Sequence, residues 1–80
     1  MISRDEFKEI CIEILKLLLD ERFSNTRHVK EDFIYKELSH RDAKAVRFCL
    51  GYLREKGYVS GFDITAGGID FLFSEEGGWK

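Results

Sequence analysis

The sequence lacks several features that would assign it to a particular class of protein. Its 80 residues include no proline and only two cysteines. No apolar run approaches the roughly 18–20 residues that a membrane-spanning helix needs, and no signal-peptide pattern opens the chain. Two cysteines far apart in the sequence do not make the disulfide framework of a small secreted domain. We therefore expect a cytoplasmic protein that does not contact a membrane.

The chain also lacks an excess of either charge. Lys and Arg number 13 and Asp and Glu number 15, so the formal net charge is −2. The balance is uneven, however, because residues 23–57 carry eight basic and five acidic groups, whereas residues 58–80 carry one basic and four acidic. A basic middle between acidic ends is typical either of an anion-facing surface or of ordinary solvated helix faces.

The length and composition indicate one small globular domain spanning residues 1–80. Hydrophobic residues make up 44% and charged residues 35% of the chain, which excludes a disordered tail. A domain of this size buries only about 60% of its unfolded surface and has no room for a large enclosed substrate pocket. A dimer or another partner is therefore plausible on stability grounds alone.

The first helix is the clearest prediction from the sequence. Ser3 and Glu6 fit a capping box, and Ile2 and Phe7 fit the hydrophobic staple that accompanies it. Apolar residues then recur at helical spacing, which predicts one core-facing stripe. The stripe consists of Phe7, Ile10, Cys11, Ile14, Leu17 and Leu18.

Three further apolar residues, Ile12, Leu15 and Leu19, widen this stripe. The apolar arc then spans roughly 220°, against about 100° for a helix buried on one side. Two explanations remain open at this point. Either a C-terminal segment containing Phe71, Phe73 and Trp79 folds back over the helix, or two copies of the chain pack these stripes together, with the dimer the favoured alternative.

Two more helices are predicted in the middle of the chain, over about 29–38 and 41–56, and Gly57 suits the C′ position that ends the latter. The expected inward side chains are Phe33, Ile34, Leu38, Ala43, Val46, Leu50 and Leu53. A short hairpin follows, in which 58–59 and 62–64 flank a turn at Ser60-Gly61. Thr65 can then cap a last helical stretch with Ile69, Leu72 and Phe73 inward, and the glycines in that stretch suggest close approach of the backbone.

This order of elements resembles the winged helix-turn-helix family. Residues 50–59 read Leu-x-x-Leu-x-x-x-Gly-Tyr-Val, which resembles the end of a recognition helix running into the first strand of the wing. Residues 64–72 read Ile-Thr-x-x-Gly-x-x-Phe-Leu, which resembles the second wing strand feeding a capped C-terminal helix. Both patterns recur in small prokaryotic and phage transcription regulators. The resemblance implies a mainly α fold with three helices, a small β-hairpin as the wing, and a C-terminal helical segment.

The resemblance also implies a function and a partner. The helix at about 41–56 would lie in the major groove of double-stranded DNA, with Arg41, Lys44 and Arg47 contacting phosphate or guanine. Arg27 and Lys30, with His28, would meet backbone phosphates near the start of the preceding helix. We therefore predict a sequence-specific DNA-binding protein, a small dimeric transcription regulator whose two recognition helices lie about 34 Å apart.

A second function, a winged-helix module that binds another protein and not DNA, fits two other features. The wing has no Lys or Arg anywhere from Gly57 to Glu76, although cations supply most non-specific affinity for DNA. Phe48 is also expected on the outward face of the third helix, and an exposed aromatic residue is typical of a protein contact. Phe48 therefore joins Ile12, Leu15 and Leu19 as a candidate interface residue.

No pattern in the sequence predicts catalysis, a cofactor or a metal site. Cys11 and Cys49 each lie on an apolar helical line, where a free thiol packs as a small hydrophobe. His28 and His40 have no partner at metal-ligand spacing, the serines suit caps and turns, and there is no glycine-rich phosphate loop. We expect a protein that is not an enzyme and that binds no small-molecule cofactor.

Overall fold

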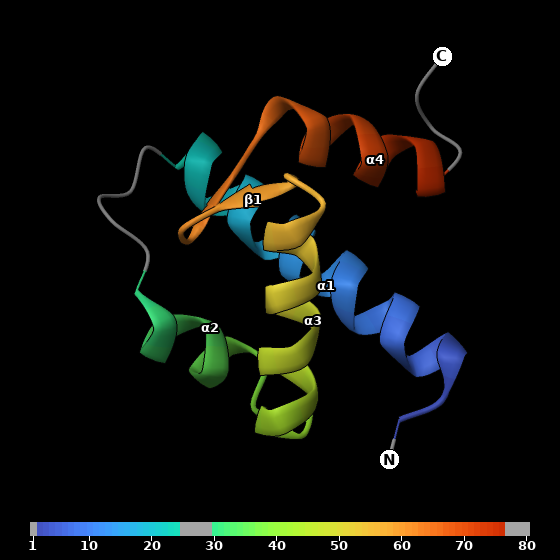
Figure 1. Cartoon of the computed structure of the whole chain (residues 1–80). Helices are drawn as coiled ribbons and strands as arrows, with labels where there is room; N and C mark the ends of the chain where they lie inside the picture. The colour runs from blue at the N-terminus through green and yellow to red at the C-terminus, as the bar shows by residue number, and fades with distance from the viewer. Residues whose placement is uncertain (1, 25–29, 77–80) are drawn as a thin grey trace.

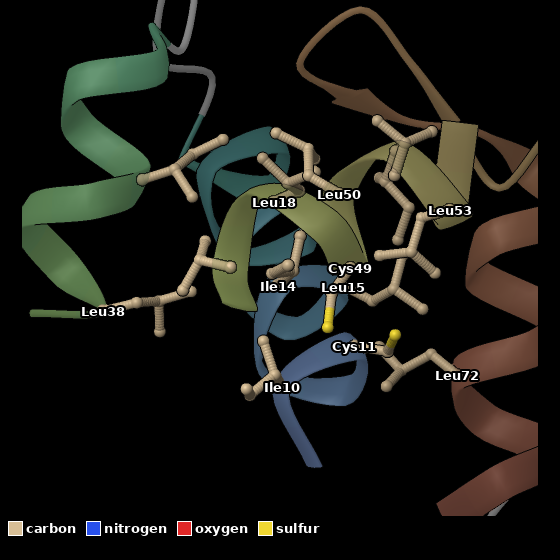
Figure 2. Close-up of a cluster of buried hydrophobic side chains, with 14 of the residues drawn as sticks. Ile10, Cys11, Ile14, Leu15, Leu18, Leu38, Cys49, Leu50, Leu53 and Leu72 are labelled. Atoms are coloured by element: carbon tan, nitrogen blue, oxygen red, sulfur yellow. The ribbon is translucent and has the colours of Figure 1, made fainter. Parts of the chain in front are cut away.

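The computed structural model describes residues 2–24 and 30–76 as a mainly helical fold with one short hairpin (Figure 1). The elements are α1 (Arg4–Phe23), α2 (Glu31–Glu37), α3 (Ala43–Glu55), β1 (Val59–Ser60), β2 (Asp63–Ile64) and α4 (Ala66–Glu76). Helix α3 crosses α1 at the centre, with α2 on one side of this pair and α4 on the other (Figures 1 and 2). The predicted fold class, mainly α with a hairpin before a C-terminal helix, is confirmed.

Helix α1 begins where the capping pattern predicts. The hydroxyl oxygen of Ser3 accepts a hydrogen bond from the backbone N–H of Glu6 at 3.1 Å, which satisfies one of the donors exposed at a helix start. Ile2 and Phe7 are half-buried and pack against the core. The central residues of the predicted stripe are fully buried. They are Ile10, Cys11, Ile14 and Leu18.

The wide apolar arc of α1 is covered within the single chain. Leu15 is 0% exposed and Leu19 is 5% exposed, because α3, β2 and α4 all contact this helix. Leu72 of α4 lies beside Cys11 of α1 (Figure 2). The prediction that Leu15 and Leu19 form a dimer interface is therefore wrong, and only Ile12 of that group remains half-buried. Trp79, the third residue expected to cover α1, lies outside the described residues.

Helix α3 begins two residues later than predicted. Asp42 is its N-cap, and the carboxylate accepts a hydrogen bond from the backbone N–H of Ala45 at 3.2 Å. An aspartate satisfies an exposed N–H at a helix start and therefore fixes the boundary there. In this register Ala43 is exposed and Ala45 is buried, so the prediction of Ala43 as a core residue is wrong. The core positions Val46, Leu50 and Leu53 are confirmed.

The end of α3 and the hairpin follow the predicted order with a shift of one residue at the turn. Gly57 has φ +79, and the N–H of Tyr58 bonds the carbonyl of Leu53 at 2.9 Å, which is the C′ arrangement expected of this glycine. The strands pair antiparallel, Val59 with Ile64 and Ser60 with Asp63. The turn residues are consequently Gly61 and Phe62, because Gly61, with φ +64, takes the left-handed position.

Helix α4 starts at the predicted cap. The hydroxyl oxygen of Thr65 accepts a hydrogen bond from the N–H of Gly68 at 3.1 Å and donates one to the carbonyl of Gly57 at 2.7 Å. Leu72 is buried, whereas Ile69 and Phe73 are half-buried against the core. The side chain of Phe71 stacks on Tyr58 with ring centroids 4.6 Å apart, which joins α4 to the base of the hairpin.

The two cysteines are buried opposite each other, on α1 and α3 (Figure 2). Burial raises the pKa of Cys11 to about 12 and also raises the pKa of Cys49. A thiol with a pKa of about 12 has on the order of a thousandfold less thiolate at pH 8 than an exposed cysteine.

Because both thiols are buried, we expect both to react slowly with a chromogenic disulfide reagent at pH 8 in the native protein. Both should react rapidly in denaturant, and rapid reaction without denaturant would contradict this burial.

Candidate nucleic-acid interface

Helix α3 has one face buried in the core and an opposite, exposed face that carries cations. Its buried face, formed by Val46, Cys49 and Leu53, packs into the core. Lys44 and Arg47 are exposed and lie one helical turn apart on the opposite side. A helix with cations one turn apart on its outer face can place both against the same phosphate-lined groove.

Arg54 is a cation on this helix that the sequence prediction missed. It lies two turns beyond Arg47, and its Nε donates a hydrogen bond to the carbonyl of Gly61 at 2.8 Å. Its guanidinium lies over the ring of Phe62, 4.5 Å from the ring centroid. The sequence did contain a signal for it: Arg54 follows Arg47 by seven residues, about two helical turns, so the two side chains lie on nearly the same side of the helix.

Helix α2 carries Tyr35 and begins directly after the cationic N-cap residue Lys30. The hydroxyl of Tyr35 donates a hydrogen bond to the carboxylate of Glu31 at 2.9 Å. Burial and this bond raise the pKa of Tyr35, while the positive charges of Arg47 and Arg54 act in the opposite direction. Both guanidinium groups therefore lie within electrostatic reach of Tyr35. Lys30 is the N-cap residue of α2 and is exposed, as its predicted role requires.

Arg41 does not lie on the outer face of α3, where the prediction put it. It precedes the N-cap of the helix, and its side chain is 18% exposed because it packs against α1. Nη2 and Nε donate to the two carboxylate oxygens of Glu13 at 2.6 and 3.1 Å. Nη2 also donates to Glu9 at 3.3 Å, and Nη1 lies 3.9 Å from Glu6. The structure thus places Arg41 in an ion-pair network and apart from Lys44 and Arg47.

The Arg41 network predicts a dependence of stability on pH. The hydrogen bond from Arg41 holds the pKa of Glu13 below its ordinary value. A carboxyl group with a lowered folded-state pKa adds stability that is fully present above its unfolded pKa, about 4.3, and is lost as the pH falls through its folded pKa. We expect Glu13→Gln to reduce the loss of unfolding free energy between pH 6 and pH 3, as measured by urea denaturation. Glu37→Gln, which removes an exposed carboxylate on α2, is the control, and equal behaviour of the two variants would contradict the pairing.

Beside the basic side chains lies a small aromatic surface. Phe48 is 65% exposed, and its ring centroid lies 5.8 Å from that of Phe7 on α1. Phe7 also meets Tyr52 edge to face at 5.1 Å. An open groove of about 270 Å³ adjoins this cluster. It is lined by Ile2, Ser3, Arg4, Phe7 and Phe48. We call these residues, together with Tyr52, the aromatic groove.

Two of the predicted phosphate-contacting residues, Arg27 and His28, lie outside the described residues. Among residues 2–24 and 30–76, no group of three or more His, Cys, Asp or Glu side chains is placed to hold a metal ion. Within the same residues, no helix is long and apolar enough to cross a membrane.

The described residues form a mainly helical fold with one short hairpin. Three helices, a two-stranded antiparallel hairpin and a C-terminal helix are compatible with a winged helix-turn-helix. No family model, no curated protein and no solved structure matches this chain.

Proposed function

We propose that this protein is a non-enzymatic, sequence-specific DNA-binding protein, a small dimeric transcription regulator of the winged helix-turn-helix type. The observation that carries the proposal is the pair of exposed cations on α3, Lys44 and Arg47, on the side of the helix that points away from the core. The hairpin stands at the end of this helix, where a wing would flank bound DNA (Figure 1).

The chemistry of these side chains suits the major groove. An α-helix fits the groove, which is about 12 Å wide, and side chains of its N-terminal half reach the base edges. Arg47 can donate two hydrogen bonds to a guanine, whereas Lys44 can neutralise a phosphate. Lys30, exposed at the start of α2, and Arg27 would contact the backbone. Arg41 has no part in this proposal, since its guanidinium is paired with Glu13.

The double variant Lys44→Ala/Arg47→Ala tests the proposed interface. Loss of a guanine contact costs about 1–3 kcal/mol, so duplex affinity at low salt should fall by about tenfold or more. If both side chains contact phosphates, the slope of log K against log salt should also become shallower by about 1.8. The measurement is fluorescence anisotropy with labelled duplex DNA over a range of salt concentrations.

Lys56→Ala is the matched control for that experiment. It also removes a positive charge from α3 and its cap, but its side chain lies about 120° around the helix axis from Lys44. We expect it to keep most of the wild-type affinity. A wild-type protein that does not bind duplex DNA at low salt would refute the proposed function.

The aromatic groove favours a second candidate function, a protein-interaction module without DNA binding. A large exposed aromatic residue beside an apolar groove is typical of a protein contact.

Phe48 is also the one residue of the predicted dimer interface that is exposed, since Leu15 and Leu19 are buried. Phe48→Glu should therefore lower the sedimentation coefficient if this groove joins two copies. Phe23→Glu is the matched control. Phe23 is 75% exposed at the C-terminal end of α1, whereas Phe7, which contacts Phe48, lies near the start of that helix. This variant should leave the sedimentation coefficient unchanged.

A further inference from the structure

The hairpin has no Lys or Arg of its own, yet a guanidinium lies at its tip. Residues 57–65 contain one charged side chain, the exposed Asp63. Arg54, from the last turn of α3, reaches this tip through its Nε bond to the carbonyl of Gly61 and through the ring of Phe62. The charge that the strands lack is thus supplied by the helix that precedes them.

The hairpin is also fixed at its other end. Arg22, in the last turn of α1, donates a hydrogen bond from Nη1 to the carbonyl of Ile64 at 2.6 Å. The hydroxyl of Thr65 bonds the carbonyl of Gly57 across the base of the hairpin at 2.7 Å. Because both ends are held by side chains from other parts of the fold, the tip has a defined position relative to α3. The Arg54 guanidinium therefore has a defined position as well.

We propose that Arg54 is the cation of the wing: it holds the hairpin tip beside α3 and presents its guanidinium to a backbone phosphate of bound duplex DNA. This inference rests on the proposed function and extends it to a residue and a contact. An arginine can do both at once. Its Nε bonds Gly61, one face of the plane stacks on Phe62, and the remaining N–H groups suit a phosphate in a bidentate arrangement.

The surroundings of Arg54 support an anion at this place. The side chain is exposed, so the unused part of the guanidinium is open to solvent. Arg47 and Arg54 are seven residues apart, two helical turns, so both guanidinium groups lie on nearly the same side of α3. Acidic groups on the neighbouring elements include the exposed Glu55, next to Arg54 on α3, Glu31, which accepts the hydrogen bond from Tyr35, and Asp63 on β2. Because of this spacing, a polyanion lying along α3 would meet Arg54 on the same side as Arg47.

The test compares Arg54→Gln, Arg54→Lys and Lys56→Gln. Binding of a labelled mixed-sequence duplex is measured over a range of salt concentrations, and circular dichroism verifies that each variant is folded. One phosphate contact contributes about 0.9 to the slope of log K against log salt and on the order of tenfold in affinity at about 0.1 M salt. Arg54→Gln should lose both. Lys56→Gln removes the same charge two residues away and should lose neither.

Arg54→Lys separates the positioning of the hairpin from the contact with phosphate. A lysine keeps the charge but lacks the planar guanidinium that stacks on Phe62 and can offer paired N–H groups to a phosphate, so the salt slope should return while affinity stays below wild type. A wild-type slope in Arg54→Gln would overturn the inference and leave the proposed function intact, provided that Lys44→Ala/Arg47→Ala still loses binding. Absence of duplex binding by the wild type would overturn both.

Discussion

Replacing Gly68 with alanine is expected to destabilise the protein strongly, because an added methyl group would meet the backbone of the hairpin. Gly68 is buried in the first turn of α4. An added Cβ would overlap the backbone carbonyl oxygen of Tyr58 and lie 2.9 Å from Cγ1 of Ile64. A carbonyl oxygen in a fixed backbone cannot move aside as a flexible side chain can, so α4 would have to shift away from the hairpin.

The expected cost is about 3 kcal/mol or more, at the upper end of the range for overpacked sites. A domain of this length has about 4–12 kcal/mol of stability in total, so such a loss would leave Gly68→Ala close to unfolding. Urea denaturation followed by far-ultraviolet circular dichroism measures the change.

Gly67→Ala is the matched control, one residue earlier in the same helix. Its added Cβ would lie 3.7 Å from the hydroxyl oxygen of Thr65 and 3.9 Å from Cδ1 of Tyr58, which is ordinary van der Waals contact. Alanine is a better helix former than glycine, so this variant should gain up to about 1 kcal/mol. Equal stability of the two variants would contradict the close approach of α4 to Tyr58.

This pair of glycines shows what the sequence can and cannot predict about the fold. Helix starts and ends depend on neighbouring residues, and the caps at Ser3, Thr65 and Gly57 were therefore predictable. Which of the two positions requires glycine depends on how α4 packs against Tyr58. The pattern Gly-Gly predicts close approach but does not distinguish the two positions.

The candidate site likewise has features that the sequence predicts and features that it does not. The exposure of Lys44, Arg47 and Phe48 on one side of α3 follows from helical periodicity and is confirmed. The partners of Arg41 and Arg54 were not predictable from local pattern, because they depend on which element each side chain faces. Arg41 pairs with Glu13, which is 28 residues away in the sequence.

A signal for the Arg41 network was nevertheless present in the sequence. Glu6, Glu9 and Glu13 recur at spacings of three and four, so they lie along one side of α1. Such a row of carboxylates attracts a cation from a neighbouring element. The nearest cation after the turn that follows α2 is Arg41, whose side chain contacts all three.

The packing of α3, β2 and α4 against α1 makes Leu15 a core residue. Leu15→Ala is expected to lower the free energy of unfolding by about 3 kcal/mol, because the side chain is 0% exposed and its removal leaves a cavity in the core. If Leu15 is buried within one chain, the native oligomeric state should not change. The loss relative to wild type should also be the same at low and high protein concentration.

Ile12→Ala is the control for the Leu15→Ala variant. Ile12 lies on the same helix and is half-buried, so its truncation should cost less than that of Leu15. Sedimentation of both variants then separates the core from the surface of α1. A Leu15→Ala protein that dissociates to a smaller species while keeping its unfolding free energy would place this side chain between two copies. An unchanged sedimentation coefficient with a large loss of stability would confirm that α3, β2 and α4 cover the wide apolar arc of α1 within one chain.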